Sequence, residues 1–254
     1  MILTIDVGNS IVTFGGFEED ELVFTARLST GTARTEDEYA SALAGLLDLR
    51  GVDRASITGA ILSSVVPAAG AVIKRAVSLL CGVEPLTVGP GIKTGLGIHC
   101  DDPASVGADL ICTSVAAARL YTSPCLIVDM GTATKLTVVN ESGAFIGVSI
   151  LPGVAMGLEA LAGGAAQLPH VSLEAPARAI GKNTADCMRS GVIYGHAAAV
   201  DGMIDRISAE FGRSLPVYAT GGLAPVILPH LSHEVTFDEH LVLRGLNLLY
   251  HKNT

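Results

Sequence analysis

Two short motifs in the sequence have the residue types of a phosphate-binding site. In each, an apolar strand ends in an acid and is followed by a turn of glycine and small hydroxyl or amide residues. Glycine lets the backbone approach a ligand, exposed backbone amides can donate to phosphate oxygens, and the acid can hold Mg²⁺. The motifs are Asp6-Val7-Gly8-Asn9-Ser10 and Asp129-Met130-Gly131-Thr132-Ala133.

Taken singly, either motif is better explained as a hairpin turn that needs glycine at positive φ. The two together favour another interpretation, because Asp129 follows Asp6 by 123 residues in a chain of 254. Two loops placed half a chain apart can clamp the two ends of one polyphosphate. We therefore predict a pair of phosphate loops.

A third glycine-containing segment, residues 217–224, leaves a predicted strand and enters a predicted helix. Its Gly221-Gly222 pair would let the backbone pack against a flat ligand such as adenine. A simple strand-to-helix turn explains the same residues equally well, and the sequence alone does not decide between them.

The elements that position these motifs form an α/β pattern that occurs twice. In the first half, three antiparallel strands precede a helix whose start is marked by a capping box of Thr35 and Glu38. A strand, a helix and a strand follow, and the second half opens with three strands again. The repeat predicts two similar lobes, residues 1–122 and 123–254, that face each other across a cleft. The strands are predicted at 2–6, 11–17, 22–28, 57–63, 84–88, 126–129, 135–140 and 143–150, and a second helix at 68–80.

The composition excludes several other classes of protein. With 49% hydrophobic and 16% charged residues, the chain can bury a core and is not disordered as a whole. Its net charge of −9 repels nucleic acid and anionic membranes on average, so a bound phosphate must be held locally. We find no signal peptide and no uninterrupted membrane-spanning stretch, and we expect a cytoplasmic protein. Five scattered cysteines without a Cys-x-x-Cys pair argue against disulfides and a zinc site.

Seven motifs, spread over almost the whole chain, resemble those of the type III pantothenate kinases. The resemblance implies a duplicated ribonuclease-H-like fold, shared with acetate and sugar kinases, Hsp70 and actin, and a homodimer. It also implies ATP-dependent phosphorylation of pantothenate to 4′-phosphopantothenate, the first step of coenzyme A synthesis. The motifs are Asp6-Val7-Gly8-Asn9-Ser10, Lys93-Thr94-Gly95-Leu96, Val106-Gly107-Ala108-Asp109, Asp129-Met130-Gly131-Thr132-Ala133-Thr134, Ala166-Gln167-Leu168-Pro169, Ile180-Gly181-Lys182-Asn183-Thr184 and Ala219-Thr220-Gly221-Gly222.

The resemblance also implies roles for single residues. Asp109 resembles the family's general base, which takes the proton of the pantothenate hydroxyl; without the resemblance, an acid that favours a helix N-terminus would explain it as well. Asp6 resembles the residue near Mg²⁺, and Asp129 the ligand of a monovalent cation, K⁺ or NH₄⁺. The implied ATP contacts are Asp6, Val7, Gly8, Asn9, Ser10, Ile11, Val12, Thr13, Thr132, Gly221 and Gly222. The implied pantothenate contacts are Cys100, Gly107, Ala108, Asp109, Leu110 and Thr184.

A long helix near the end of the second half is the expected site of dimerisation. Thr184 resembles a contact lent by the other subunit, which would place the active site at the subunit interface. The same residue is also suited to be the N-cap of this helix, and both roles are compatible. Over residues 191–200 only His196 interrupts an apolar or small surface, which indicates burial on more than one side, in a dimer or within the lobe.

Three residues depart from the family's usual pattern. Leu110 stands where Arg is frequent and Cys100 where Tyr is frequent, which leaves the affinity for pantothenate, and even the substrate's identity, open. Lys135 follows Thr134 where a second Thr is usual. We hypothesise that its ammonium partly replaces the monovalent cation at Asp129, although a solvated surface lysine is the commoner arrangement.

Two rival functions are weighed against the kinase. A ribonuclease-H-like nuclease would use Asp6, Asp109 and Asp129 as a two-metal cluster, but the acidic charge and the lack of a basic run count against it. A catalytically weak or inactive paralogue would keep the fold as a nucleotide-binding regulatory protein. His230 and His233 are three residues apart, but they lack a third ligand, so we expect a surface loop there and no metal.

Overall fold

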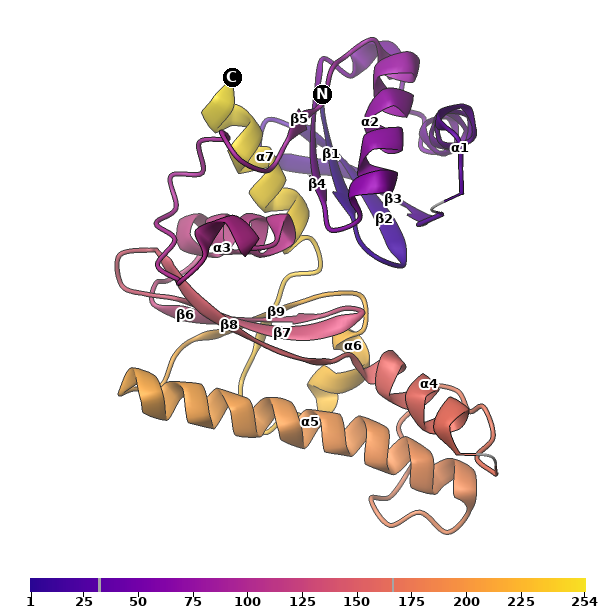
Figure 1. Cartoon of the computed structure of the whole chain (residues 1–254), viewed down its shortest axis with the longest axis vertical. Coiled ribbons are helices and arrows are strands. Elements are labelled where there is room, and N and C mark those ends of the chain that lie inside the picture. The colour runs from indigo at the N-terminus through magenta and orange to yellow at the C-terminus, as the bar shows by residue number, and fades with distance from the viewer. Residues whose placement is uncertain (32, 166) are drawn as a thin grey trace. The chain divides into compact units, whose positions relative to one another are not determined.

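The computed structural model describes residues 1–31, 33–165 and 167–254, and these form two compact units (Figure 1). The first unit comprises Met1–Tyr121 with Leu241–Thr254, and the second comprises Thr122–His240. The boundary near the middle of the chain lies one residue from the predicted one. Residues 241–254, which we expected in the second lobe, instead fold with the first unit.

The first unit is built on a five-stranded sheet in the order β3-β2-β1-β4-β5. Strands β1, β2 and β3 are antiparallel, whereas β4 and β5 run parallel to β1. Leu3, Ile5 and Val7 alternate along β1 and are fully buried on one face, where α1 and α2 pack. The bounds are β1 Ile2–Val7, β2 Ile11–Glu18, β3 Glu21–Ser29, α1 Glu36–Leu49, β4 Gly59–Ser64, α2 Pro67–Cys81 and β5 Leu86–Thr87, with a 3₁₀ helix at Arg54–Ser56.

The opposite face of this sheet is covered by α3 (Ala108–Leu120) and the C-terminal helix α7 (Leu241–Asn253). The two helices approach closely because Gly245 has no side chain: a Cβ there would lie 2.0 Å from the carbonyl oxygen of Cys112. Near its end, Asn253 accepts from the backbone N–H of Lys93 at 2.9 Å and donates to its carbonyl at 3.0 Å. These contacts explain why the C-terminal segment belongs to the first unit.

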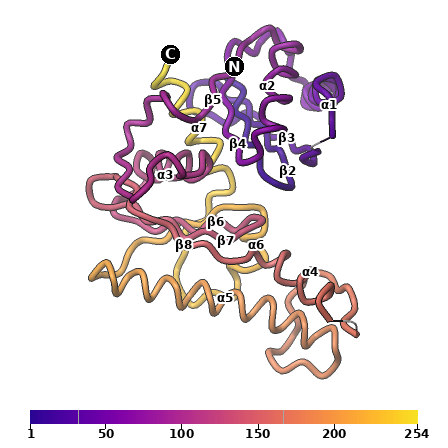
Figure 2. The backbone as a smooth tube through the Cα atoms, viewed as in Figure 1, coloured from indigo at the N-terminus to yellow at the C-terminus, as the bar shows by residue number. Residues whose placement is uncertain are grey.

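The second unit repeats the sheet order and the strand directions of the first. Its sheet runs β8-β7-β6-β9-β10, so β6 corresponds to β1, β7 to β2 and β9 to β4. Leu126, Val128 and Met130 of β6 are buried in one core cluster with residues of the long helix α5. This helix runs along the sheet of the second unit (Figure 2). The predicted duplicated α/β fold is confirmed. The bounds are β6 Cys125–Met130, β7 Ala133–Val139, β8 Phe145–Pro152, α4 Val154–Gly164, α5 Thr184–Phe211, β9 Val217–Thr220, α6 Ala224–Ile227 and β10 Thr236–Phe237, with a 3₁₀ helix at Leu228–His230. A further 3₁₀ helix, Pro103–Ser105, belongs to the first unit.

The N-termini of α1 and α5 show which of the predicted capping residues are used. The predicted capping box is confirmed: Glu38 N–H donates to Thr35 Oγ1 at 3.3 Å, and Thr35 N–H donates to Glu38 Oε2 at 2.7 Å. For α5 the expected cap was wrong by one residue. Asn183 is the N-cap, because its Oδ1 accepts from the N–H of Asp186 at 2.9 Å, and Thr184 is the first helical residue. No helix in the described ranges is long and apolar enough to span a membrane.

Candidate active site

Asp6 lies at the end of β1, on the face of the first sheet that α3 and α7 cover. The register places it between Thr13 of β2 and Ser63 of β4. The Ser63 hydroxyl, which is fully buried, donates to Asp6 Oδ1 at 2.5 Å. A hydrogen bond to a carboxylate from a rigid strand fixes its direction. Ser63 was missed in the sequence, where only the parallel pairing of β1 with β4 would have indicated it.

The turn that follows Asp6 presents its tip to solvent. The Gly8 N–H closes it by donating to Ile11 O at 3.0 Å, and Thr30 donates from its hydroxyl to Gly8 O at 2.8 Å. Asn9 and Ser10 are exposed. The explanation from positive φ was wrong, because neither Gly8 nor Gly131 of the second loop has one. Gly8 instead lets the two sides of the turn approach each other closely, since a Cβ there would lie 3.0 Å from Ile11 O.

Asp109 is the second residue of α3 and lies in its first turn, as predicted. Its carboxylate folds back over the helix N-cap Gly107, where a Cβ would lie only 2.5 Å from Asp109 Oδ1. Glycine at position 107 is therefore what leaves room for this carboxylate. Ala108 completes the segment, and Leu110 is buried, with 7% of its surface exposed.

The pKa of one buried thiol indicates that Asp6 and Asp109 both lie near that thiol. Burial, together with the negative charges of Asp6 and Asp109, raises the pKa of the Cys112 thiol well above its ordinary value, and Ser63 partly opposes this. Both carboxylates therefore lie near one point on the α3 face of the first sheet. Cys112 was not predicted as part of this region, because its position depends on how α3 docks. Cys100 is half-buried in the segment before α3.

In the second unit, three glycine-containing segments meet at the end of β6. A Cβ at Gly153 would lie 2.2 Å from Thr132 O, and Gly153 N–H donates to that oxygen at 3.2 Å. Gly221 has a φ of +98°, and a Cβ there would lie 2.5 Å from Met130 O. The fold thus brings the predicted second phosphate loop together with the predicted adenine segment, and it adds Gly153, which the sequence analysis missed.

Asp129, at the end of β6, forms an ion pair with Lys135 of β7. The two residues are directly opposite in the antiparallel register, and Lys135 Nζ lies 2.7 Å from Asp129 Oδ2. Their side chains are only 17% and 14% exposed for Lys135 and Asp129, respectively. The expectation of a solvated surface lysine was therefore wrong. One oxygen of this carboxylate is therefore already in contact with an ammonium.

Two other motifs of the resemblance lie outside these loops. Gly181 packs against the start of α5, where a Cβ would lie 2.4 Å from the backbone nitrogen of Cys187. In the motif of residues 166–169, Ala166 lies outside the described residues, so that motif is not placed as a whole.

His233 fastens a loop to α5. Its Nδ1 lies 2.8 Å from Asp201 Oδ1, and its Nε2 lies 3.0 Å from Asp205 Oδ1. The hydrogen bond with Asp201, and more weakly Asp205, raises the pKa of His233 despite some burial. Within the described ranges, no three His, Cys, Asp or Glu side chains are grouped in a way that could hold a metal ion.

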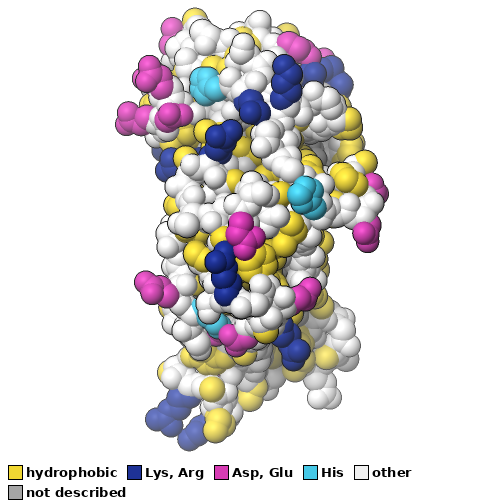
Figure 3. Space-filling model, turned by 90° about the vertical axis from the view of Figure 1, so that its left-hand side faces the viewer, with side chains coloured by type: hydrophobic (Ala, Val, Ile, Leu, Met, Phe, Trp, Pro, Cys, Tyr) yellow, Lys and Arg dark blue, Asp and Glu magenta, His cyan; other side chains and the backbone are white. Residues whose placement is uncertain are grey.

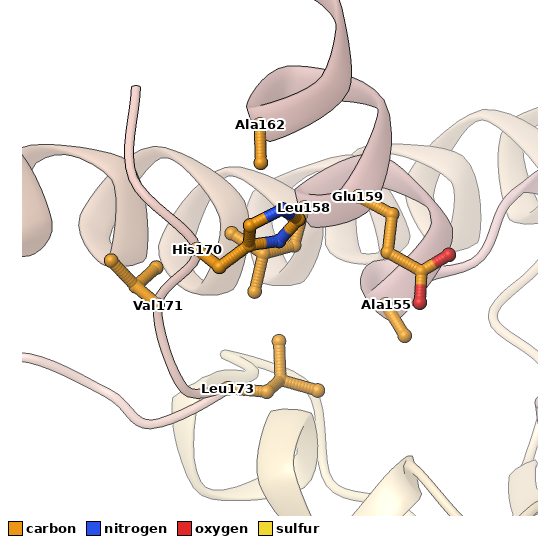
Figure 4. A pocket seen from close by; sticks show the side chains of 7 residues that line it. All are labelled: Ala155, Leu158, Glu159, Ala162, His170, Val171 and Leu173. Carbon is orange, nitrogen blue, oxygen red and sulfur yellow. The ribbon is translucent and has the colours of Figure 1, made fainter. Parts of the chain in front are cut away.

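A cavity of about 260 Å³ lies beside α4, away from the predicted site residues (Figure 4). The His170 ring lies near Leu158, and the other side chains are mostly apolar. The cavity is lined by Ala155, Leu158, Glu159, Ala162, His170, Val171 and Leu173.

On the face shown in Figure 3, the described Lys and Arg side chains lie among acidic and uncharged ones and form no continuous basic strip.

Two sheets of the same order, each with an acid and a glycine-containing turn at the end of its central strand, define the class of actin-like ATPases and sugar kinases. The fold is similar to a putative 2-dehydro-3-deoxygalactonokinase from Sinorhizobium meliloti, with TM-score 0.60, 15% identity and coverage of 99% of this chain and 96% of that one. It is also similar to the activator of a 2-hydroxyisocaproyl-CoA dehydratase from Clostridium difficile with bound ADPNP, with TM-score 0.56, 13% identity and coverage of 98% and 93%.

Sequence comparison narrows this class to one family. A family model described as type III pantothenate kinase matches residues 2–206. The chain is 41% identical over 254 residues to the type III pantothenate kinase of Moorella thermoacetica, covering 100% of both proteins. It is 42% identical to that of Geobacillus thermodenitrificans, covering 100% of this chain and 98% of the relative. The chain belongs to the type III pantothenate kinase family and is a kinase.

Proposed function

We propose that this protein transfers the γ-phosphoryl group of ATP to the primary hydroxyl of pantothenate, giving 4′-phosphopantothenate for coenzyme A synthesis in the cytoplasm. Asp109 is the general base of this reaction. The observation that carries the proposal is that Asp6, held by Ser63, lies on the face of the first sheet that α3 covers, and that Asp109 lies in the first turn of α3. A proton acceptor and a metal-binding carboxylate therefore lie in one region, in a chain whose family is named for this activity.

Phosphoryl transfer depends on positioning and on charge neutralisation more than on covalent help from the protein. Asp6 suits Mg²⁺, which commonly takes one or two carboxylates together with substrate phosphates. When bound, the ion neutralises charge on the phosphate oxygens. Ser63 holds the Asp6 carboxylate in place. The backbone amides of Gly8, Asn9 and Ser10, in the turn that Thr30 fastens, donate to phosphate oxygens.

Asp109 receives the proton as the hydroxyl of pantothenate attacks. Gly107 keeps space for its carboxylate, and the first turn of α3 fixes its direction. Ala108, Cys100 and Leu110 would contact the pantothenate. Since Leu110 is buried and uncharged, its contribution is apolar. The site therefore holds pantothenate without a guanidinium at this position.

In the second unit, Thr132 contacts the phosphates, and the backbone at Gly221 and Gly222 packs against adenine. The remaining ATP contacts of the first hairpin are Val7, Ile11, Val12 and Thr13. Of these, Val7 and Val12 are fully buried, so they shape the loop and only their backbone can face the nucleotide. The K⁺ or NH₄⁺ ion that the family resemblance implies at Asp129 stays a prediction. The ammonium of Lys135 already contacts one oxygen of this carboxylate.

We also propose a homodimer that α5 forms and in which Thr184 reaches the partner's substrate. One side of α5 exposes a run of small residues, and Ile180 just before the helix is 81% exposed. Small residues let two helix backbones pack closely, so this surface suits a second copy of itself. Sedimentation of the purified protein tests the dimer. The exposed residues are Cys187, Gly191, Gly195, Ala198 and Ala199.

The decisive experiment detects 4′-phosphopantothenate by mass after incubation of the protein with ATP, Mg²⁺ and pantothenate. We expect Asp109→Asn to lower kcat by about 10²–10⁴-fold with the fold intact, because the proton acceptor is lost. Asp101→Asn, an exposed acid in the preceding segment, is the matched control and should retain activity. Nucleotide binding without product from the unaltered protein would instead favour the regulatory paralogue.

A further inference from the structure

The Asp129–Lys135 pair is a feature of the second hairpin that has no counterpart in the first. Asp129 and Asp6 occupy equivalent places on β6 and β1, and each has one directly opposite partner on the next antiparallel strand. For Asp6 that partner is Thr13, an uncharged hydroxyl, whereas for Asp129 it is Lys135. The second hairpin therefore contains a fixed positive charge next to its turn.

The alternation of side chains along β7 explains how Lys135 reaches Asp129. Its neighbour Thr134 points to the α5 face, where its Oγ1 lies 2.9 Å from Nε2 of His196, and Leu136 is buried in the α5 core. Lys135 must therefore leave the sheet on the other face, as Asp129 does. The ammonium lies at hydrogen-bonding distance from the carboxylate, with both side chains largely buried.

The charge and size of this group are those of a small monovalent cation. An ammonium is a compact positive charge with three N–H donors, so contact with Asp129 still leaves donors for other acceptors. A largely buried ion pair contributes little to folding stability, because the loss of water offsets the attraction. A positive charge held beside Asp129, three residues after Thr132 in the same hairpin, is suited to binding an anion.

We propose that Lys135 is the built-in cation of the second phosphate loop, so that this enzyme binds nucleotide phosphates without K⁺ or NH₄⁺. The inference rests on the proposed nucleotide site at this loop. It makes Lys135 a specificity-determining residue: the tethered ammonium holds the carboxylate of Asp129 and presents a positive charge to the phosphates, in place of an ion taken from solution.

The unaltered protein gives the first test. Calorimetry measures the Kd of a non-hydrolysable ATP analogue with Mg²⁺, in KCl and in tetramethylammonium chloride at equal ionic strength. Because tetramethylammonium is too large and lacks N–H donors, we expect the two Kd values to agree within about twofold if Lys135 supplies the charge. A Kd at least about tenfold higher without K⁺ would overturn the inference. Failure to bind the analogue in either salt would count against the proposed function instead.

A variant separates Lys135 from the rest of the site. In tetramethylammonium, Lys135→Met should weaken analogue binding by about tenfold to a hundredfold, and K⁺ or NH₄⁺ should restore it to within a few-fold. K⁺ should also raise the melting temperature of this variant but not that of the unaltered protein, a readout that needs no catalysis. Arg213→Met is the matched control, since it breaks an exposed pair with Glu141 in the same unit and should behave as the unaltered protein.

A double variant covers the case in which an unpaired Asp129 prevents folding. Asp129→Asn combined with Lys135→Met removes both charges, so binding should be weak in every salt, with no rescue by K⁺ or NH₄⁺. Two outcomes would show that the charge at Lys135 does not serve the nucleotide. In the first, either variant binds the analogue in tetramethylammonium as tightly as the unaltered protein does. In the second, K⁺ restores binding by the double variant.

Discussion

The hairpins that follow Asp6 and Asp129 are built on the same plan but carry different chemistry. In each, the acid ends the central strand, a parallel strand supplies a hydroxyl residue beside it, Ser63 or Thr220, and the next backbone segment donates to the carbonyl after the acid. The turns differ by one residue. Gly8 N–H donates to the residue three positions on, whereas Gly131 N–H donates two positions on.

This comparison shows what the duplication fixes and what it leaves free. The fold fixes where the acids, turns and hydroxyls lie, because these depend on strand pairing. The cross-strand partner is free to change, and it decides whether the acid is available to a metal ion. The cross-strand partner of Asp6 is the uncharged Thr13, which leaves the carboxylate suited to Mg²⁺, whereas the cross-strand partner of Asp129 is the ammonium of Lys135.

The largest effect expected from this difference is at Asp6. In Asp6→Asn the amide cannot replace a carboxylate on Mg²⁺, so kcat/KM should fall by about 10²–10³-fold. Steady-state kinetics at several Mg²⁺ concentrations measures it. Asp20→Asn, at the exposed tip between β2 and β3, is the control and should be active. Full activity of Asp6→Asn would mean that the first hairpin does not hold the metal.

A second effect concerns the backbone around each turn. Gly221→Ala should lower the free energy of unfolding by about 2–4 kcal/mol, because φ there is +98° and the new Cβ would lie 2.5 Å from Met130 O. Gly8→Ala meets Ile11 O at 3.0 Å without a positive φ and should lower it by only about 1 kcal/mol. Urea unfolding measures both. Equal losses of unfolding free energy in the two variants would contradict the conclusion that the backbone packs more tightly at Gly221 than at Gly8.

Much of this architecture could be predicted because it depends on local patterns. The Thr35–Glu38 box, the strand ends at Asp6 and Asp129 and the helix start at Asp109 are set by neighbours in the sequence. The cap of α5 shows the limit: Asn183 and Thr184 can both cap a helix, and only the position of the Asp186 N–H decides between them.

The features that escaped prediction depend on contacts between distant residues. Gly245 packs on Cys112, from which the whole second unit separates it in the sequence, so the place of α7 could not be predicted from local patterns. The burial and ion pair of Lys135 escaped prediction for a related reason. Its cross-strand partner is Asp129 only because the turn between β6 and β7 has two residues. A turn one residue longer, as in the first hairpin, would have paired Lys135 elsewhere.

The smallest expected effect is a pH dependence confined to the second unit. The raised pKa of His233 stabilises the fold fully below the ordinary value of 6.5, and this contribution is lost as pH rises through the folded value. For Asp201, burial alone would raise the pKa, but hydrogen bonds from His233 and Ser232 lower it overall, so its contribution is present above the ordinary 3.8 and lost in more acidic solution. Both contributions therefore coincide between about pH 4 and 6.

The free energy of unfolding should accordingly be higher near pH 5.5 than near pH 8, by less than about 1 kcal/mol because the pair is partly exposed. His233→Gln should remove most of this difference, since a neutral amide keeps contacts with Asp201 but does not titrate. His99→Gln, an exposed histidine of the first unit, should leave it unchanged. Urea unfolding at the two pH values measures the effect. If His99→Gln abolished the difference as well, the pH dependence would not arise from the loop that His233 fastens to α5.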